Sequence, residues 1–172
     1  KMKSLSEHAV NIRTSDYNTL NYKKIDDDYK TSIRKERVKS HSEVLIANFL
    51  FTNGIKYEYE KFYVNKDAYH SYKPDFYLTD YDIYIEFFGI DKNNNPAPYI
   101  NKQKYFEEMN LKINMHKKNG TKLIKLYYHQ KQNNKLLLVL ESELKKYDVR
   151  FNPIPSEEVL LAIEKTKKKE KF

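Results

Sequence analysis

The 172-residue chain contains no cysteine. This absence excludes a disulfide framework, a thiolate zinc site and a thiol nucleophile. The sequence also lacks any apolar run near the roughly 20 residues that a membrane span needs, and it shows no charged and apolar leader segment. We therefore expect a soluble, cytoplasmic protein with no membrane partner.

Basic residues outnumber acidic ones. The chain has 32 lysines and arginines against 24 acidic residues, which gives a formal net charge of +8. This balance favours a polyanionic partner such as nucleic acid, although dispersed lysines are also typical of a solvated surface. The 16 tyrosines and nine phenylalanines provide core volume, and their flat faces can stack on bases.

The length fits one domain with a hydrophobic core. Residues 1–36 are polar and show no sustained periodicity, so we interpret them as an N-terminal extension of a domain that covers residues 37–172. Because Lys1 precedes the first methionine, we expect the chain to be part of a longer protein.

Periodicity and capping signals predict the elements of this domain. Ser40 and Glu43 have the spacing of a capping box, and Gly54 suits the end of the same helix. A helix is expected from about Tyr99 or Asn101 to Lys118. The other expected elements are a strand at 55–59, a hairpin at 72–89, a strand at 121–128, a polar turn at 129–134, and helices at 136–147 and 156–169. This order predicts an α/β domain with a mixed sheet flanked by helices.

The hairpin YKPDFYLTDYDIYIEFFG carries the strongest functional signal. Its turn lies midway between Asp75 and Glu86, so antiparallel pairing places the two carboxylates opposite each other. Two like charges beside aromatic residues repel each other unless a divalent cation neutralises them, and we expect this repulsion to destabilise the metal-free chain. The pattern therefore predicts a metal site, with two solvated hairpin acids as the alternative.

The order of these elements and motifs resembles that of PD-(D/E)XK nucleases. The resemblance spans about Lys39 to Tyr147, and its pieces are SEVLIANFLFTNGIKYEYE, YKPDFYL, IYIEFFG and YFEEMNLKINMHKKNGTKLIKLYY. These pieces look closest to the nuclease-like domain inserted in superfamily-1 helicases of the UvrD and helicase IV type. The resemblance implies a restriction-endonuclease-like fold, a DNA partner and flanking helicase domains in the parent chain.

The resemblance also implies a set of metal ligands. Asp75 and Glu86 are expected to hold Mg²⁺ or Mn²⁺, which prefer oxygen ligands. The main-chain carbonyl of Phe87 is a plausible further ligand, and Glu43 resembles the auxiliary acid of the family. Glu43 has a structural alternative, because a Glu at the third position of a capping box already has a partner.

One position departs from the family pattern. The family lysine normally lies two residues after the second acid, where this chain has Phe88. In the helicase-inserted relatives a lysine of the following helix takes this role, and Lys112 fits it best, with Lys104 as the alternative. Such a lysine activates the attacking water or stabilises charge on the phosphate. Lys112 can also be an ordinary exposed helix residue.

Further residues are candidates for contact with nucleic acid. Tyr105, Met109, Lys112 and His116 share one face of the predicted helix, which we expect to face the hairpin. His116 can contact phosphate or serve as a hydrogen-bonding group of the core, and Tyr105 can bind phosphate or pack in the core. Lys104 on a neighbouring face of this helix is a further candidate. The others lie just before the Pro-Asp turn and line the expected cleft: Tyr72 and Lys73.

The sequence thus predicts a Mg²⁺- or Mn²⁺-dependent deoxyribonuclease. Asp75, Glu86, Lys112 and Glu43 are its expected catalytic residues. Two alternatives remain open at this point. The first is an inactive module of the same fold that only binds nucleic acid or a protein partner. The second is a structural domain that stiffens a larger helicase.

Overall fold

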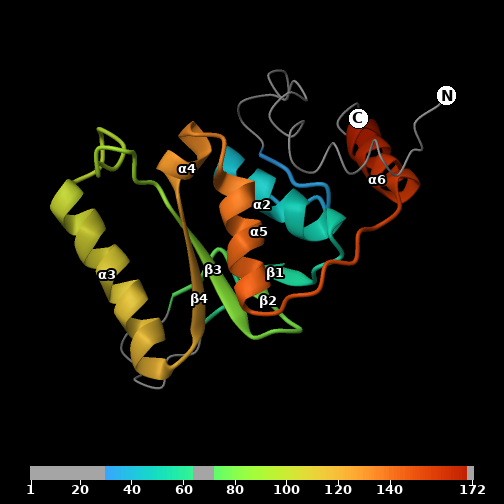
Figure 1. Cartoon of the computed structure of the whole chain (residues 1–172). Helices are drawn as coiled ribbons and strands as arrows, with labels where there is room; N and C mark the ends of the chain where they lie inside the picture. The colour runs from blue at the N-terminus through green and yellow to red at the C-terminus, as the bar shows by residue number, and fades with distance from the viewer. Residues whose placement is uncertain (1–29, 64–71, 170–172) are drawn as a thin grey trace. The chain divides into compact units, whose positions relative to one another are not determined.

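The computed structural model describes residues 30–63 and 72–169 of the chain (Figure 1). The predicted α/β class is confirmed, because these residues form a four-stranded mixed sheet and a set of helices. They divide into two compact units, one made of residues up to Ile55 together with those from Arg150 onward, and one made of Lys56–Val149. The expected extension at 1–29 and the loop at 64–71 lie outside the described residues.

Helix α2 (His41–Thr52) dominates the first unit and begins where the capping box predicts. The Ser40 side chain accepts a hydrogen bond from the main-chain N–H of Glu43, and most residues of the helix are buried, including the polar Ser42 and Asn48. The helix ends at Thr52 with Asn53 as its C-cap, and Gly54 follows with φ +66°. A Cβ atom at this glycine would lie 2.1 Å from the carbonyl oxygen of Asn152. Both the left-handed backbone and this close approach therefore require glycine.

The first unit is built from two segments, one before and one after the second unit in the sequence. Ile33 is buried, and its N–H donates to the side-chain carbonyl of Asn48 over 2.8 Å. The last residues of the expected polar extension are therefore part of the folded unit. Phe151 packs edge-on against Phe49 with ring centroids 6.2 Å apart, and helix α6 (Ser156–Lys169) begins at the predicted serine.

The second unit contains the whole sheet, with strands in the order β1 (Tyr57–Tyr59), β2 (Phe76–Leu78), β3 (Ile83–Phe88) and β4 (Lys122–Tyr127). The first three strands are antiparallel neighbours, and β4 pairs parallel to β3. The connection from β3 to β4 contains helix α3 (Lys102–Asn119), because a parallel pair needs a long crossover. Asn101 caps the start of α3, and Gly120 ends it with φ +65°.

Helix α3 lies on one side of β3 and β4, and helix α5 (Leu136–Lys146) lies on the other (Figure 1). The polar segment after β4 was predicted to be a turn, but it contains the short helix α4 (Tyr128–Gln132). Tyr128 therefore belongs to this helix and not to the strand. The side chain of Gln130 accepts a hydrogen bond from the N–H of Tyr127 over 2.9 Å, which stabilises the first turn of α4.

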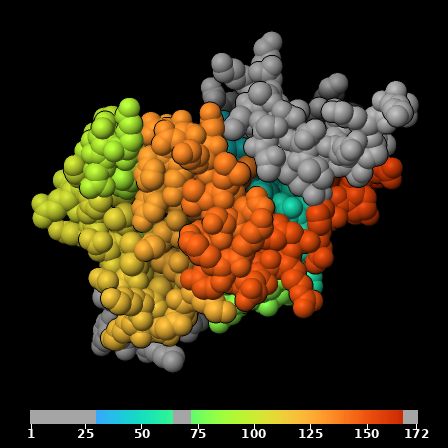
Figure 2. Space-filling model, viewed as in Figure 1, coloured from blue at the N-terminus to red at the C-terminus, as the bar shows by residue number. Residues whose placement is uncertain are grey.

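Apolar side chains of the strands form the core of the second unit. Completely buried members are Phe76, Leu78, Ile83, Ile85 and Leu126, and α5 adds Leu140 and Leu144. In the space-filling view, α3, α4 and α5 all reach the surface of this unit (Figure 2). Within the described residues, no helix is both long and apolar enough to cross a membrane.

Candidate active site

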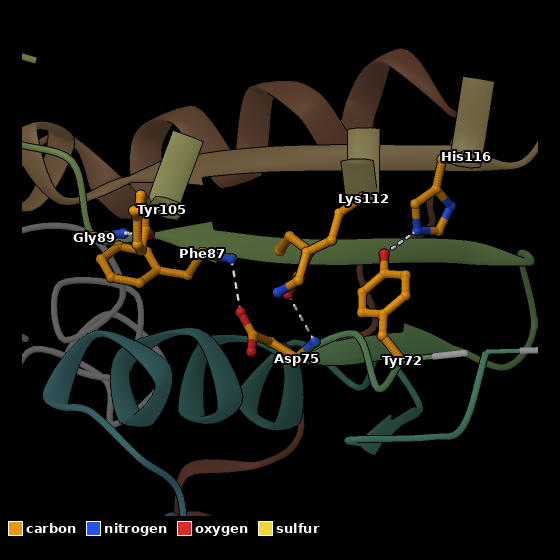
Figure 3. Close-up of polar contacts among 8 residues, drawn as sticks. Tyr72, Asp75, Phe87, Gly89, Tyr105, Lys112 and His116 are labelled. Atoms are coloured by element: carbon orange, nitrogen blue, oxygen red, sulfur yellow. Dashed lines mark hydrogen bonds and ion pairs between the residues drawn. The ribbon is translucent and has the colours of Figure 1, made fainter. Parts of the chain in front are cut away.

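Asp75 and Glu86 lie opposite each other at the start of the hairpin. The register of β2 and β3 pairs Phe76 with Ile85, so the next pair outward is Asp75 with Glu86, as the sequence predicts. Each carboxylate also binds the main chain of the other strand. The N–H of Asp75 donates to Oε2 of Glu86 over 3.1 Å, and the N–H of Phe87 donates to Oδ2 of Asp75 over 2.7 Å (Figure 3).

Lys112 of α3 supplies the counter-charge of this pair. Its ammonium lies 2.7 Å from Oε1 of Glu86, whose side chain is only 2% exposed. Among the described residues no regular hydrogen bond reaches this buried oxygen, so the lysine is its ion-pair partner. These contacts oppose the expected repulsion between Asp75 and Glu86, and the destabilisation of the metal-free chain stays a prediction. One carboxylate is neutralised by Lys112, and both accept main-chain N–H groups.

Phe88 lies two residues after Glu86 on β3. Phe88 is 3% exposed, and its ring lies 5.7 Å from the ring of Tyr127 on the neighbouring strand. A side chain two residues along a strand from Glu86 points to the same side of the sheet, which is the side that α3 covers. The aromatic ring thus fills packing space, and the lysine reaches Glu86 from α3.

The predicted face of α3 does point towards β3. The hydroxyl of Tyr105 accepts a hydrogen bond from the N–H of Gly89 over 2.7 Å, at the end of β3. Burial raises the pKa of Tyr105. Lys104, the alternative to Lys112, is largely exposed and lies 4.0 Å from Glu108 one turn along the same helix. Lys112 is therefore the lysine that the structure brings to Glu86.

His116 occupies a buried position one turn after Lys112. The residue is 1% exposed, and its Nε2 atom is hydrogen-bonded to the hydroxyl of Tyr72. Its Nδ1 atom lies 2.7 Å from Oγ1 of Thr121. Burial lowers the pKa of His116 to about 4, so the ring is neutral at pH 7. Both ring nitrogens have protein partners, which agrees with the alternative of a hydrogen-bonding group inside the unit. The phosphate contact of His116 stays a prediction.

Tyr72 connects His116 with Lys112. Its hydroxyl binds His116, and the Lys112 ammonium lies over its ring, 5.2 Å from the centroid. Burial and the nearby charge of Glu86 raise the pKa of Tyr72, so its phenol stays protonated. Lys73, the next residue, is exposed. The expected contact of Lys73 with nucleic acid stays a prediction.

Glu43 belongs to the first unit, and its carboxylate makes local bonds at the start of α2. It accepts the N–H of Lys39 over 3.0 Å and the hydroxyl of Ser40 over 3.0 Å. These contacts agree with the capping alternative. The role of auxiliary acid at the metal stays a prediction.

The oxygen atoms of the hairpin fit a hard divalent cation. Asp75 and Glu86 present carboxylates from two adjacent strands, and Oε1 of Glu86 is a buried oxygen that a cation can reach in place of the lysine. The described residues contain no cluster of three or more His, Cys, Asp or Glu side chains that could hold a metal. A metal at this hairpin would therefore take its remaining ligands from main-chain oxygen, such as that of Phe87, and from water.

Sequence reasoning missed the residues that support His116. Thr121 and Tyr63 belong to this group, since the hydroxyl of Tyr63 lies 3.1 Å from Oγ1 of Thr121, and its ring centroid lies 4.5 Å from that of His116. Tyr84 packs on the same ring with centroids 5.0 Å apart. The abundance of tyrosine near the hairpin was the available signal, but it did not specify which rings meet.

Comparison of the chain with models of protein families, with curated proteins and with solved structures finds no match.

Proposed function

We propose that the second unit has a restriction-endonuclease-like fold and hydrolyses DNA phosphodiester bonds with Mg²⁺ or Mn²⁺. The observation that supports this most strongly is the arrangement of Asp75, Glu86 and Lys112. Two carboxylates lie opposite each other at the start of a hairpin, and a lysine from the following helix is within 2.7 Å of one of them. The partner is DNA, and the parent chain is a helicase of the type that the motifs resemble.

Each residue of this group has a chemical role in the proposed reaction. Asp75 and Glu86 would hold the cation, and the carbonyl of Phe87 would be an additional ligand. When bound, the cation stabilises charge on the phosphate and lowers the pKa of a water ligand. Glu43 is the proposed auxiliary acid, although its capping bonds give it a structural role as well.

Lys112 is the proposed basic group of the reaction. In the chain alone its ammonium pairs with Glu86, and its side chain is 36% exposed, so it can also meet a ligand from solvent. Its three N–H donors can orient the attacking water and bind a non-bridging phosphate oxygen. Water then attacks phosphorus and gives up a proton to solvent, while the bond to the sugar oxygen breaks and that leaving oxygen takes a proton from solvent. The Lys112 ammonium beside the phosphate stabilises the transition state.

The experiment combines metal binding with cleavage. Calorimetric titration with Mn²⁺ should detect binding to the wild-type chain, and Asp75→Ala should abolish it. Asp75→Asn and Glu86→Gln should each remove cleavage of a plasmid and of labelled oligonucleotides. Glu108→Gln changes an exposed glutamate of α3 and is the matched control, so it should bind Mn²⁺ and cleave like the wild type. Absence of Mn²⁺ binding, or binding that survives Asp75→Ala, would contradict the proposal.

A second candidate function is binding of DNA without cleavage. The observation that favours it is the direct ion pair between Lys112 and Glu86, which neutralises one proposed ligand within the chain itself. In that case Lys112 would keep the hairpin folded and would not assist a reaction. A gel-shift assay at low salt in EDTA, followed by addition of Mn²⁺, separates the two functions. Unchanged binding and no cleavage would favour the binding module, and no binding at all would favour a structural domain.

A further inference from the structure

A continuous series of contacts leads from the start of β4 to the carboxylate of Glu86. Oγ1 of Thr121 lies 2.7 Å from Nδ1 of His116, and Nε2 of His116 is bonded to the Tyr72 hydroxyl. The ring of Tyr72 lies under the Lys112 ammonium, which pairs with Glu86. Figure 3 shows His116, Tyr72 and Lys112 along this route.

The donors and acceptors of this series are consistent with one protonation state. The raised pKa of Tyr72 keeps its phenol protonated, so the hydroxyl donates to Nε2 of His116. The remaining N–H of the neutral imidazole is then on Nδ1 and donates to Oγ1 of Thr121. The Thr121 hydroxyl has the main-chain carbonyl of His116 as its acceptor, 3.4 Å away. Every polar atom of the His116 ring therefore has a partner.

Aromatic packing fixes the His116 ring as well. Tyr63 and Tyr84 contact it with centroid distances of 4.5 Å and 5.0 Å. Tyr63 is itself held by a hydrogen bond from the side chain of Asn119 over 2.9 Å. A ring with two hydrogen bonds and packed neighbours has one orientation, so it fixes the Tyr72 hydroxyl in turn.

Lys112 needs such support because its side chain is a flexible four-carbon chain. The Glu86 carboxylate attracts the ammonium, but attraction to one oxygen alone does not define the direction of approach. The face of an aromatic ring 5.2 Å away adds a second attraction on another side. The Lys112 ammonium is thus held between the Glu86 carboxylate and the Tyr72 ring. Of these two groups, only the Tyr72 ring is held in place by His116.

We propose that Tyr72 and His116 are positioning residues that hold the Lys112 ammonium next to Glu86. This inference deepens the proposed function, on which its role in catalysis rests. Neither residue contacts the phosphate in this proposal: His116 fixes the Tyr72 hydroxyl, and the Tyr72 ring fixes the lysine. This differs from the expectation that Tyr72 and His116 bind nucleic acid themselves.

The first test observes Lys112 directly in the metal-free chain. The ring current of Tyr72 should shift the side-chain protons of Lys112 upfield in the NMR spectrum of the lysine-labelled protein. Tyr72→Leu should remove this shift, and His116→Gln should reduce it. Thr121→Val is a smaller change that removes only the hydroxyl bonded to His116, and it should reduce the shift in the same direction. Tyr84→Phe is the control, because it keeps an aromatic ring against His116. Residue 84 has no contact with Lys112 among the contacts described, so the Lys112 shift should be unchanged.

The second test measures turnover with Mn²⁺ and DNA. Tyr72→Leu and His116→Gln should each lower kcat about tenfold, with little change in KM. This loss is smaller than the roughly 10²-fold loss that is usual when a positioned acid-base group is removed altogether. In the Lys112→Ala background neither substitution should lower kcat further, because they act through the lysine. Tyr84→Phe should retain wild-type kcat.

The outcomes separate this inference from the proposed function. If the Lys112 signals stay unchanged in folded Tyr72→Leu, His116→Gln and Thr121→Val proteins, the positioning role is wrong. Additive losses of kcat in the Lys112→Ala background would also overturn it. If the Lys112 signals respond as expected but the wild type binds no Mn²⁺ and cleaves no DNA, the positioning role stands and the proposed nuclease function fails.

Discussion

The ammonium of Lys112 lies 2.7 Å from Oε1 of Glu86, although the two residues are 26 positions apart in the chain. Glu86 lies on the central strand β3 and Lys112 on the crossover helix α3. The pair therefore links the sheet to the helix beside the two hairpin acids. This ion pair determines the most informative experiments.

The first prediction concerns turnover. Lys112→Ala should reduce DNA cleavage by at least about 10²-fold, the usual scale for loss of a positioned acid-base group. Mn²⁺ affinity should stay the same or rise slightly, because the ammonium no longer pairs with Glu86. Lys104→Ala is the matched control on the same helix and should change turnover little, since that lysine is exposed and lies near Glu108. The opposite result, with loss only in Lys104→Ala, would move the role to Lys104.

The second prediction concerns stability without metal. Lys112→Met leaves the buried Glu86 carboxylate without its cation and should lower the free energy of unfolding by about 1–3 kcal/mol, the usual cost of an unsatisfied buried polar group. The double variant Lys112→Met with Glu86→Gln should lose less than the sum of the two single losses, since the two residues interact. Urea unfolding in EDTA measures these values. Simple additivity of the two losses would mean that the ion pair does not contribute in solution.

The third prediction follows from His116. Its pKa is about 4 in the folded chain and near 6.5 in the unfolded chain, so the unfolded state binds more protons between these values. The stability that neutral His116 contributes is complete above pH 6.5 and is lost as the pH falls through 4, by about 3 kcal/mol in total. Urea unfolding at pH 7, 6, 5 and 4.5 should show this loss in the wild type. The His116→Gln protein should have a flatter profile, and equal profiles would show that His116 does not titrate in this way.

The fourth prediction concerns DNA. The chain has dispersed lysines and a net charge of +8, so contacts should be made mainly to the phosphate backbone. Affinity should then fall steeply with salt and vary little with sequence. Fluorescence anisotropy at several salt concentrations, with two unrelated oligonucleotides of equal length, measures both properties. A complex that resists salt and distinguishes the two sequences would contradict backbone-directed binding.

Local signals in the sequence were sufficient to predict much of the structure of the second unit. The turn between two aromatic strands determined the register that pairs Asp75 with Glu86, because an antiparallel hairpin leaves one choice once its midpoint is known. Helical spacing likewise placed Lys112 and His116 on one face of α3, and their contacts confirm that this face points towards the strands and the chain before them. The short helix α4 was missed, because a run of polar residues has no apolar periodicity to indicate a helix.

The sequence by itself determined the pairing of the two acids and the faces of α3. Only the tertiary structure decided which lysine meets Glu86 and what His116 does, because those contacts join residues on different elements. Tyr72 and His116 are 44 positions apart, and Lys112 meets the Tyr72 ring across the same packing of α3 against the sheet. Periodicity shows which face of an element is buried, but it contains no information on which side chain of another element that face meets.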